Sequence, residues 1–333
     1  MEILQGVYQI KLPLPGGPLD HVNVYLVEGS QGNLLIDAGW NTPEAFSALK
    51  EELKSNGFDF SDISQVVITH MHPDHYGLAG RIKELSGAKV GLSEIEARLL
   101  NQRYVDVPIL LDEVSRFLRT HGVPRDELSQ LSEASMPVRE FVIPAKPETK
   151  LKNGQKVSVD PFEFKALLTP GHSPGHMCFY EPKRKLLFTG DHILPDITPN
   201  IGLHPQSGEN PLGDYINSLK SLTELEISFV FPGHGSVFSG LGQRIDLLLR
   251  HHEQRMTDIL NVIQDDPKTA YQIATDIPWV PEEGGINFQD LPPLDRRLAV
   301  LETLAHLQLL ATEGKANKVV KDRTSYYRAT YRR

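Results

Sequence analysis

The sequence predicts a mixed α/β protein with a small helical domain at its C-terminal end. Short apolar runs typical of strands alternate with amphipathic helices over the first 90 residues, and strand-like runs return between residues 138 and 190. After Gly242 the pattern changes to three helices followed by two short strand-like runs. A chain of 333 residues also fits one large domain plus a small one, or two of medium size. We therefore expect domains at residues 1–240 and 241–333.

The elements of the first domain follow from local signals. Runs rich in Val, Ile, Leu and Tyr predict the early strands, which are GVYQIKLPL, VNVYLVEG, NLLIDAG and ISQVVITH. TPEAFSALKEELKSNG has a Thr at the N-cap position, Pro in its first turn and Gly57 as a stop signal, so it predicts a helix. The later strands are FEFKALLTP, HMCFYEP, KLLFTGD and SFVFPGHG, and the helix GDYINSLKSLTEL precedes the last of them.

Residues 93–135 interrupt the alternation of strands and helices. They contain Leu-rich helical segments with no strand between them, which predicts a helical insertion. The apolar content of this insertion exceeds what one helix face needs. Two interpretations stay open: the insertion packs on the rest of the domain, or it forms a lid or dimer surface that shapes an apolar acyl pocket.

The C-terminal segment predicts a winged-helix-like module. RIDLLLRHHEQRMTDILNVI, KTAYQIATD and LDRRLAVLETLAHLQLLATEG each read as helices. ANKVVK and SYYRATY follow as strands that join in a turn at Asp322. The end of the chain is basic, since Asp322 is the only acidic residue among seven cations: Lys315, Lys318, Lys321, Arg323, Arg328, Arg332 and Arg333.

The composition excludes several classes of protein. No stretch approaches the 18 consecutive apolar residues that a membrane span needs, so we expect no membrane partner. A net charge of −9 argues against a surface that binds nucleic acid all over. The single cysteine, Cys178, cannot form an intrachain disulfide, and the start MEILQGVYQIKL lacks a secretory signal. Together these features predict a cytoplasmic protein.

The segment that follows the strand QVVIT carries an unusual density of metal ligands. It places His70, His72, Asp74 and His75 within six residues. Strand alternation would send His70 and His72 to one face, and Pro73 would end the strand before a helix that begins near Asp74. Imidazoles and a carboxylate in one turn suit Zn²⁺, Fe or Mn²⁺.

Three further segments add ligands at the ends of predicted strands. They are TPGH with His172, TGD with Asp191 and FPGH with His234. Seven ligands exceed the needs of one tetrahedral ion and fit two ions about 3.5–4 Å apart that share a carboxylate and a hydroxide. We expect structural roles for the remaining histidines considered, which are His21, His121, His192, His204, His251, His252 and His306.

The HxHxDH segment with its downstream His, Asp and His resembles the metallo-β-lactamase superfamily, over roughly residues 5–240. The resemblance implies a four-layer αββα sandwich with a dinuclear site at the sheet edges. It also implies which ligands serve each ion: His70, His72 and His172 for one, Asp74, His75 and His234 for the other, and Asp191 as the bridge. Two Zn²⁺ ions are the expected cofactor, with Fe or Mn as alternatives.

Differences at the ligand positions exclude some branches of the superfamily. True β-lactamases of one subclass have Cys where Asp191 stands, and diiron oxygen reductases have Glu in place of His72. The sequence is similar to glyoxalase II, the lactonases, ribonuclease Z and the β-lactamase-like-protein-2 group. The last group also carries a C-terminal winged-helix-like domain, so it resembles this layout best.

Three functions remain open, in this order. The first is a dinuclear hydrolase in which a metal-bridging hydroxide attacks a small thioester, lactone or ester and Asp74 accepts its proton. The second is a metal-dependent single-strand endoribonuclease guided by the basic end, so nucleic acid is a less favoured partner than a small molecule. The third is a non-enzymatic winged-helix regulator. Substrate, native metal and the roles of Tyr76, His192 and His204 stay open, and a homodimer is a reasonable expectation.

Overall fold

The structure is a computed structural model that describes residues 1–16, 19–136, 140–279 and 285–330. Contacts divide the chain into two compact units. Unit 1 comprises residues 1–105, 137–199 and 218–245, and unit 2 comprises residues 106–136, 200–217 and 246–333. The two helices α7 (Pro211–Leu222) and α8 (Leu241–Val262) run across these boundaries.

Unit 1 contains two β-sheets. The seven-stranded sheet has its strands in sequence order, β1 to β7, and the five-stranded sheet has the order β12-β11-β10-β9-β8. The strands of the first sheet are β1 (Glu2–Leu4), β2 (Val7–Pro13), β3 (His21–Val27), β4 (Asn33–Ile36), β5 (Ile63–Val67), β6 (Lys89–Ser93) and β7 (Thr149–Leu151). Those of the second are β8 (Lys156–Val159), β9 (Phe162–Leu168), β10 (Met177–Glu181), β11 (Leu186–Gly190) and β12 (Phe229–Pro232).

Each face of the seven-stranded sheet covers a different hydrophobic core. In β3, Val24 and Leu26 belong to the core shared with the helices, whereas Tyr25 and Val27 belong to the core between the two sheets. This alternation follows from the two-residue period of a strand. The helices of unit 1 are α1 (Pro43–Ser55), η1 (Phe60–Asp62), α2 (Pro73–Tyr76), α3 (Ala79–Ser86) and α4 (Glu94–Tyr104).

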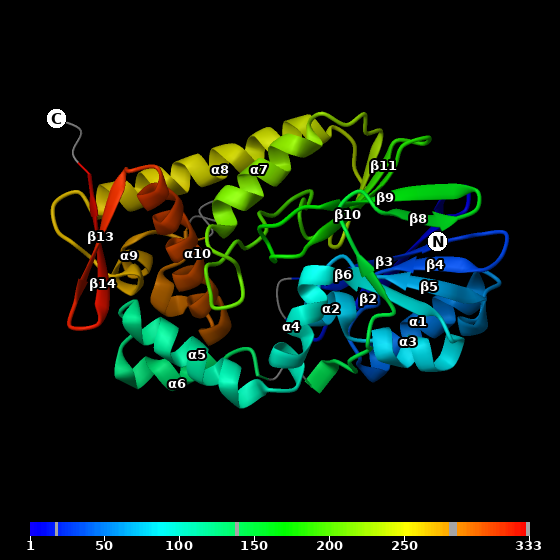
Figure 1. Cartoon of the computed structure of the whole chain (residues 1–333), viewed down its shortest axis with the longest axis horizontal. Helices are drawn as coiled ribbons and strands as arrows, with labels where there is room; N and C mark the ends of the chain where they lie inside the picture. Colours follow the sequence, from blue (N-terminus) through cyan, green and yellow to red (C-terminus); the bar gives the residue numbers. More distant parts are fainter. Residues whose placement is uncertain (17–18, 137–139, 280–284, 331–333) are drawn as a thin grey trace. The chain divides into compact units, whose positions relative to one another are not determined.

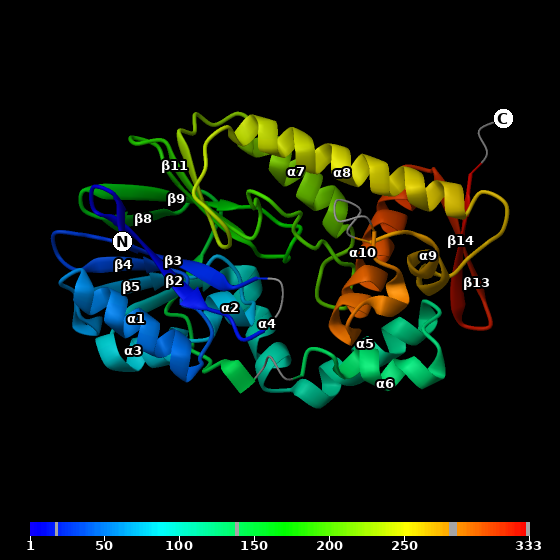
Figure 2. The same ribbon diagram turned by 180° about the vertical axis from the view of Figure 1, so that it is seen from behind.

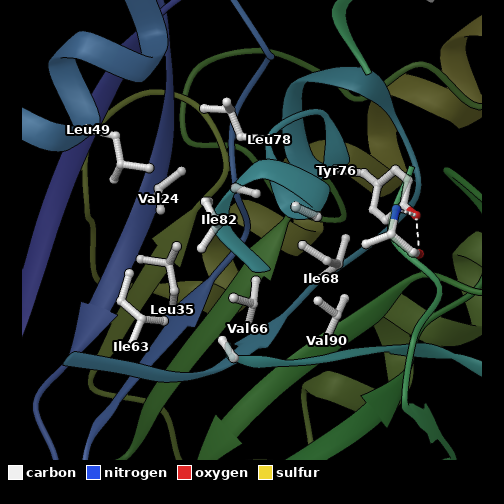
Figure 3. Packing of buried hydrophobic residues seen from close by; sticks show 14 of the residues in the cluster. Val24, Leu35, Leu49, Ile63, Val66, Ile68, Tyr76, Leu78, Ile82 and Val90 are labelled. Atoms are coloured by element: carbon white, nitrogen blue, oxygen red, sulfur yellow. Dashed lines mark hydrogen bonds between the residues drawn. The ribbon is translucent and has the colours of Figure 1, made fainter. Parts of the chain in front are cut away.

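The core under the helices shows why the first helix forms where the sequence predicts it. Thr42 caps α1 by accepting a hydrogen bond from the Ala45 N–H at 3.1 Å. Leu49 of α1 and Ile82 of α3 pack toward the strand residues of β3 to β6 (Figure 3). Figure 1 shows α1 and α3 along the blue and cyan strands of this sheet.

Strand direction brings the loops of the site to the same edge within each sheet. β4, β5 and β6 are parallel, and β9, β11 and β12 share one direction because each is antiparallel to β10 or parallel to β11. The carboxyl ends of β9, β11 and β12 therefore lie at one edge of the five-stranded sheet. The segment after β5 likewise lies at the carboxyl edge of the parallel strands in the seven-stranded sheet.

Unit 2 is helical with one hairpin. Its own elements are α5 (Val107–Thr120), α6 (Arg125–Glu133), α9 (Ala270–Asp276), η4 (Phe288–Asp290), α10 (Pro293–Thr312), β13 (Ala316–Lys321) and β14 (Thr324–Ala329). Helix α10 lies beside α9 and the red hairpin (Figure 2). Asp322 and Arg323 form the hairpin loop with φ of 50° and 63°, as a two-residue type I′ turn requires.

The unit boundaries differ from the expected domain boundary at residue 240. The predicted insertion was assigned to the first domain, but its residues 106–136 fall in unit 2 with the C-terminal helices. The physical reason is a shared core: Leu118 and Leu131 belong to the same buried cluster as Ile259 and Leu304. Within the described ranges, no helix is both long and apolar enough to span a bilayer. Of the predicted basic end, Arg332 and Arg333 lie outside the described residues.

Candidate metal centre

The HxHxDH segment lies in the loop after β5 rather than on the strand itself. β5 ends at Val67, and Asp37 at the end of β4 then accepts hydrogen bonds from the Thr69 N–H at 2.7 Å and the Thr69 hydroxyl. The strand thus ends before His70 and His72, so strand alternation does not position these two side chains as predicted, although both belong to one ligand group. Pro73 begins α2, as predicted, because its fixed φ suits the first turn of a helix.

One group of ligand atoms comes from three histidines. His70, His72 and His172 each offer a ring nitrogen, and these nitrogens all lie within 4.8 Å of one another. His72 Nδ1 and His172 Nε2 are 3.0 Å apart. Burial lowers the pKa of His70 and of His72 well below the usual value, so both rings are neutral and able to offer a lone pair.

The second group combines histidines and carboxylates. Asp74, His75, Asp191 and His234 also place one ligand atom each within 4.8 Å of all the others. His75 Nε2 lies 3.2 Å from Asp191 Oδ1, and His234 Nε2 lies 3.3 Å from Asp74 Oδ2. Two ligands of one tetrahedral Zn²⁺ ion are about 3.3 Å apart when each metal–ligand bond is about 2.0–2.1 Å, so the spacing suits a shared ion.

Asp191 faces both groups. Its Oδ1 lies 3.2 Å from His75 Nε2 and 3.5 Å from His234 Nε2, whereas its Oδ2 lies 3.7 Å from His172 Nε2. The two oxygens of one carboxylate thus point toward ligands of different groups. This arrangement fits a carboxylate that joins two ions.

Three of the histidine ligands have one ring nitrogen without a hydrogen-bond partner among the described residues and the other ring nitrogen held by a contact. The Nε2 atoms of His70, His75 and His234 are buried and have no hydrogen-bond partner among the described residues. Their Nδ1 atoms contact Thr69 Oγ1, Asp37 Oδ2 and the carbonyl oxygen of His21. Second ring nitrogens held in this way are typical of metal-binding histidines. The nitrogen and oxygen donors therefore fit divalent metal ions.

Electrostatics support cation binding at the second group. Burial opposes protonation of His75, but Asp191, Asp74 and Asp37 outweigh it and raise its pKa well above the usual value. For His234 burial again opposes protonation, and Asp191 and Asp74 raise the pKa to about 10. The carboxylates thus attract positive charge to this spot, and a divalent cation supplies that charge without protonating the rings.

Several residues around the centre were not found from the sequence. Asp37 ends the apolar run NLLI in a left-handed conformation with φ of 64°, and the signal for it was a carboxylate directly after a buried strand. Glu96 is fully buried on α4. His176 is buried with its ring centroid 5.1 Å from that of His70, and its Nδ1 contacts Thr169 Oγ1. Its signal was the repeated Gly-His in GHSPGH.

The structure gives Tyr76 a role that the sequence left open. Its hydroxyl donates to the Ala145 carbonyl at 2.5 Å and accepts from the Ala145 N–H at 2.7 Å (Figure 3). Tyr76 therefore anchors the segment that returns toward β7. His192 is buried, and burial lowers its pKa to about 3, while His204 Nδ1 accepts from the Gln206 N–H.

The family model for the metallo-beta-lactamase superfamily matches residues 17–234. The chain belongs to this superfamily. Residues 17–234 hold all seven predicted ligands and most of the two sheets. The superfamily's members typically bind metal ions, in agreement with the donor groups described above.

Curated relatives agree with this membership. The chain is 29% identical to the probable metallo-hydrolase YqjP of Bacillus subtilis, over 98% of this chain and 99% of that protein. It is 25% identical to the beta-lactamase-like protein 2 homolog of Caenorhabditis elegans, over 81% of this chain and 76% of that protein. Family and relatives together indicate a hydrolase.

Solved structures of the superfamily share the fold. A metallo-beta-lactamase family protein of Thermus thermophilus is 32% identical, with a TM-score of 0.83 over 99% of this chain and 100% of that one. A beta-lactamase domain protein of Burkholderia ambifaria has a TM-score of 0.84 at 24% identity, over 99% of this chain and 94% of that one, and agrees in fold. The predicted metallo-β-lactamase fold is thus confirmed.

Proposed function

We propose that this superfamily member is a dinuclear metal-dependent hydrolase that acts on a small thioester, lactone or ester. The observation that carries the proposal is the placement of Asp191, whose two oxygens face ligands of two separate groups at 3.2 and 3.7 Å. A site for one ion would not need a carboxylate between two complete sets of donors.

Each ligand then has a place. His70, His72 and His172 would hold one ion, Asp74, His75 and His234 would hold the other, and Asp191 would contribute to both. Zinc is the proposed metal because imidazole and carboxylate donors suit it, with Fe and Mn as alternatives. When bound, two divalent ions provide hydroxide near neutral pH and polarise the oxygen of the scissile group.

Asp74 is the proposed catalytic base. Burial favours its neutral form, but His75 and His234 outweigh it and lower its pKa, so its carboxylate is ionised, which is the form that a base requires. Its side chain is 19% exposed, more than the side chains of Asp191 and His234 beside it. Asp74 is therefore the acidic ligand most open to an incoming substrate.

A relative supports an acyl substrate. The chain is 26% identical to the atrochrysone carboxyl ACP thioesterase of Aspergillus fumigatus, over 78% of this chain and 49% of that protein. That protein's name describes hydrolysis of a thioester. We extend to this chain only the reaction class, namely attack on an acyl carbon.

One surface observation favours a second candidate, a single-strand endoribonuclease. Residues Asn317 to Lys321 of β13 are exposed, and this strand and its turn carry Lys318, Lys321 and Arg323. Such a basic hairpin would contact phosphates, and RNA binding would then weaken steeply with salt.

The winged-helix-like assignment of residues 241–333, the homodimer and the cytoplasmic location stay predictions.

A substrate panel distinguishes the two activities. Zinc-loaded protein is assayed beside Asp74→Asn against acyl thioesters, lactones, simple esters and a labelled single-stranded RNA. Hydrolysis of an acyl compound that the variant loses supports the leading proposal. Cleavage of the RNA alone, lost in the same variant, replaces it with the second candidate. Equal rates for the two proteins on every compound contradict both.

A further inference from the structure

One buried carboxylate outside the ligand set contacts two of the segments that carry ligands. Glu96 lies in the first turn of α4 and has no exposed surface. Its Oε2 accepts from the Met71 N–H at 2.9 Å, and its Oε1 accepts from the Ser173 hydroxyl at 2.8 Å and the Gly175 N–H at 2.9 Å. Burial raises the pKa of this carboxyl, and the hydrogen bonds from Met71, Ser173 and Gly175 oppose that rise.

Two of the residues that donate to Glu96 are sequence neighbours of the predicted histidine ligands. Met71 stands between His70 and His72, and Ser173 directly follows His172. Met71 is held on both sides from α4, since its carbonyl also accepts a hydrogen bond from the Tyr104 hydroxyl. The three histidines of one ligand group are thus connected through neighbouring backbone to a single helix.

The segment that carries His172 can approach Glu96 only with a glycine at position 175. A Cβ atom at Gly175 would lie 2.4 Å from Ser93 Oγ and 2.7 Å from Glu96 Cγ. Ser93 in turn caps α4 by accepting from the Glu96 N–H at 3.1 Å. The loop therefore reaches the carboxylate only because position 175 carries no side chain.

A purely packing role does not account for these contacts. An apolar residue of similar size at position 96 would fill the space, but it would leave the buried Met71 and Gly175 N–H groups without acceptors. A glutamine also fails. Either orientation of its amide turns the NH₂ group toward an N–H or O–H donor that now needs an acceptor.

We propose that Glu96 is a positioning residue that holds the three-histidine group in its binding geometry and so sets the affinity for the ion there. The inference rests on the proposed dinuclear site. The second group has its own carboxylates, and Asp37 holds its His75, so it does not depend on Glu96 in the same way. Loss of Glu96 therefore affects one ion more than the other.

The test compares Glu96→Gln with Glu94→Gln. Glu94 lies in the same helical turn, but it pairs with Arg98 and with Lys152 at 3.8 Å and is 32% exposed. Both variants replace a carboxyl group with an amide in the same helical turn. Each protein is dialysed against a series of buffered free Zn²⁺ concentrations, and bound zinc per chain is measured by mass spectrometry.

The expected result is two ions for the wild type and Glu94→Gln over the whole series. Glu96→Gln should bind one ion as before and the other with about 10–100-fold weaker affinity. If Glu96→Gln binds both ions with wild-type affinity, the inference is overturned and the proposed function stays intact. A wild type that binds fewer than two ions overturns the proposed function and the inference with it.

A milder variant decides the case in which Glu96→Gln does not fold. Ser173→Ala removes only one of the three hydrogen bonds to Glu96, and Ser173 is not a predicted ligand. In this variant we expect the affinity for one of the two ions to fall several-fold, while the circular dichroism spectrum stays unchanged. Unaltered zinc affinity in this folded variant overturns the inference.

Discussion

His75 Nδ1 donates a hydrogen bond to Asp37 Oδ2 at 2.8 Å, and both groups are buried. The same carboxylate accepts from the N–H and the hydroxyl of Thr69, which precedes His70. Asp37 therefore fixes the orientation of one candidate ligand and the start of the loop that carries the others. When the ring is neutral and Nδ1 donates, the lone pair of His75 lies on Nε2, which faces Asp191.

Asp37→Asn should weaken metal binding by about 10–100-fold and lower the rate of hydrolysis at limiting zinc. An amide has one acceptor oxygen where the carboxylate has two, so either His75 or Thr69 loses its acceptor. Zinc affinity and hydrolysis rate are measured together. Asp276→Asn, an exposed partner of Lys268 in unit 2, is the matched control. Wild-type affinity in Asp37→Asn would show that this contact does not orient a ligand.

Asp191→Ala should abolish turnover, with less than about a tenth of the wild-type rate remaining. Its loss removes the carboxylate that both ligand groups face and part of the negative charge that offsets two cations. The prediction is tested by measuring the steady-state rate and the metal content of the zinc-loaded variant. A rate above a tenth of wild type would contradict the dinuclear assignment.

Tyr76→Phe should destabilise the fold by about 1–3 kcal/mol without changing the hydrolysis rate of the folded protein. It removes a buried hydroxyl that serves both backbone groups of Ala145, which then lack partners. Urea unfolding measures the effect. Tyr8→Phe is the control, because the Tyr8 hydroxyl contacts Glu28 at the surface and its loss should cost little. Equal midpoints for the two variants would count against the role given to Tyr76.

Unit 2 contains a buried histidine pair that links its stability to pH. His306 Nδ1 donates to the Glu302 carbonyl at 2.8 Å, so neutral His306 presents Nε2 as the acceptor for His252 Nδ1 at 3.1 Å. Burial, with a smaller contribution from Arg255 nearby, lowers the pKa of His306 to about 3. Burial also lowers the pKa of His252 well below its usual value.

These depressed values make the fold less stable in acid. Below about pH 6.5 the unfolded chain takes up protons that folded His306 does not, so the free energy of unfolding falls as pH falls. Between pH 7 and pH 5 this one histidine should account for a loss of about 2 kcal/mol. The direction holds down to the folded pKa of about 3.

Comparison with His306→Gln isolates this effect. Both proteins are studied without metal, so the ligand histidines contribute equally to the two pH profiles. We expect the variant to be less stable than the wild type at pH 7 but to lose about 2 kcal/mol less between pH 7 and pH 5. Parallel profiles would show that folding does not lower the pKa of His306.

The sequence predicted well whatever depends on local patterns. Thr42 as the cap of α1, the turn at Asp322 and the helices of the C-terminal segment are all confirmed, since capping, turn type and apolar spacing act over a few residues. The seven predicted ligands also gather into two groups, because each follows the carboxyl end of a strand. Their assignment to metal ions stays a prediction.

What the sequence could not predict depends on contacts between distant segments. Glu96 resembles any acidic residue in the first turn of a helix, and only the fold places it beside Met71 and Ser173. The grouping of residues 106–136 with the C-terminal helices likewise depends on a core built from Leu118 and Leu304, far apart in the chain. Periodicity marks such residues as buried but does not say against what.

The central claim is a site that needs two ions for acyl hydrolysis, and a zinc titration of activity tests it most directly. Metal-free protein receives zinc in steps, and hydrolysis of an acyl thioester, lactone or ester from the panel is followed at each step. The account predicts that the rate rises until two equivalents per chain are bound. A rate that saturates at one equivalent, or no acyl hydrolysis at two, would contradict it.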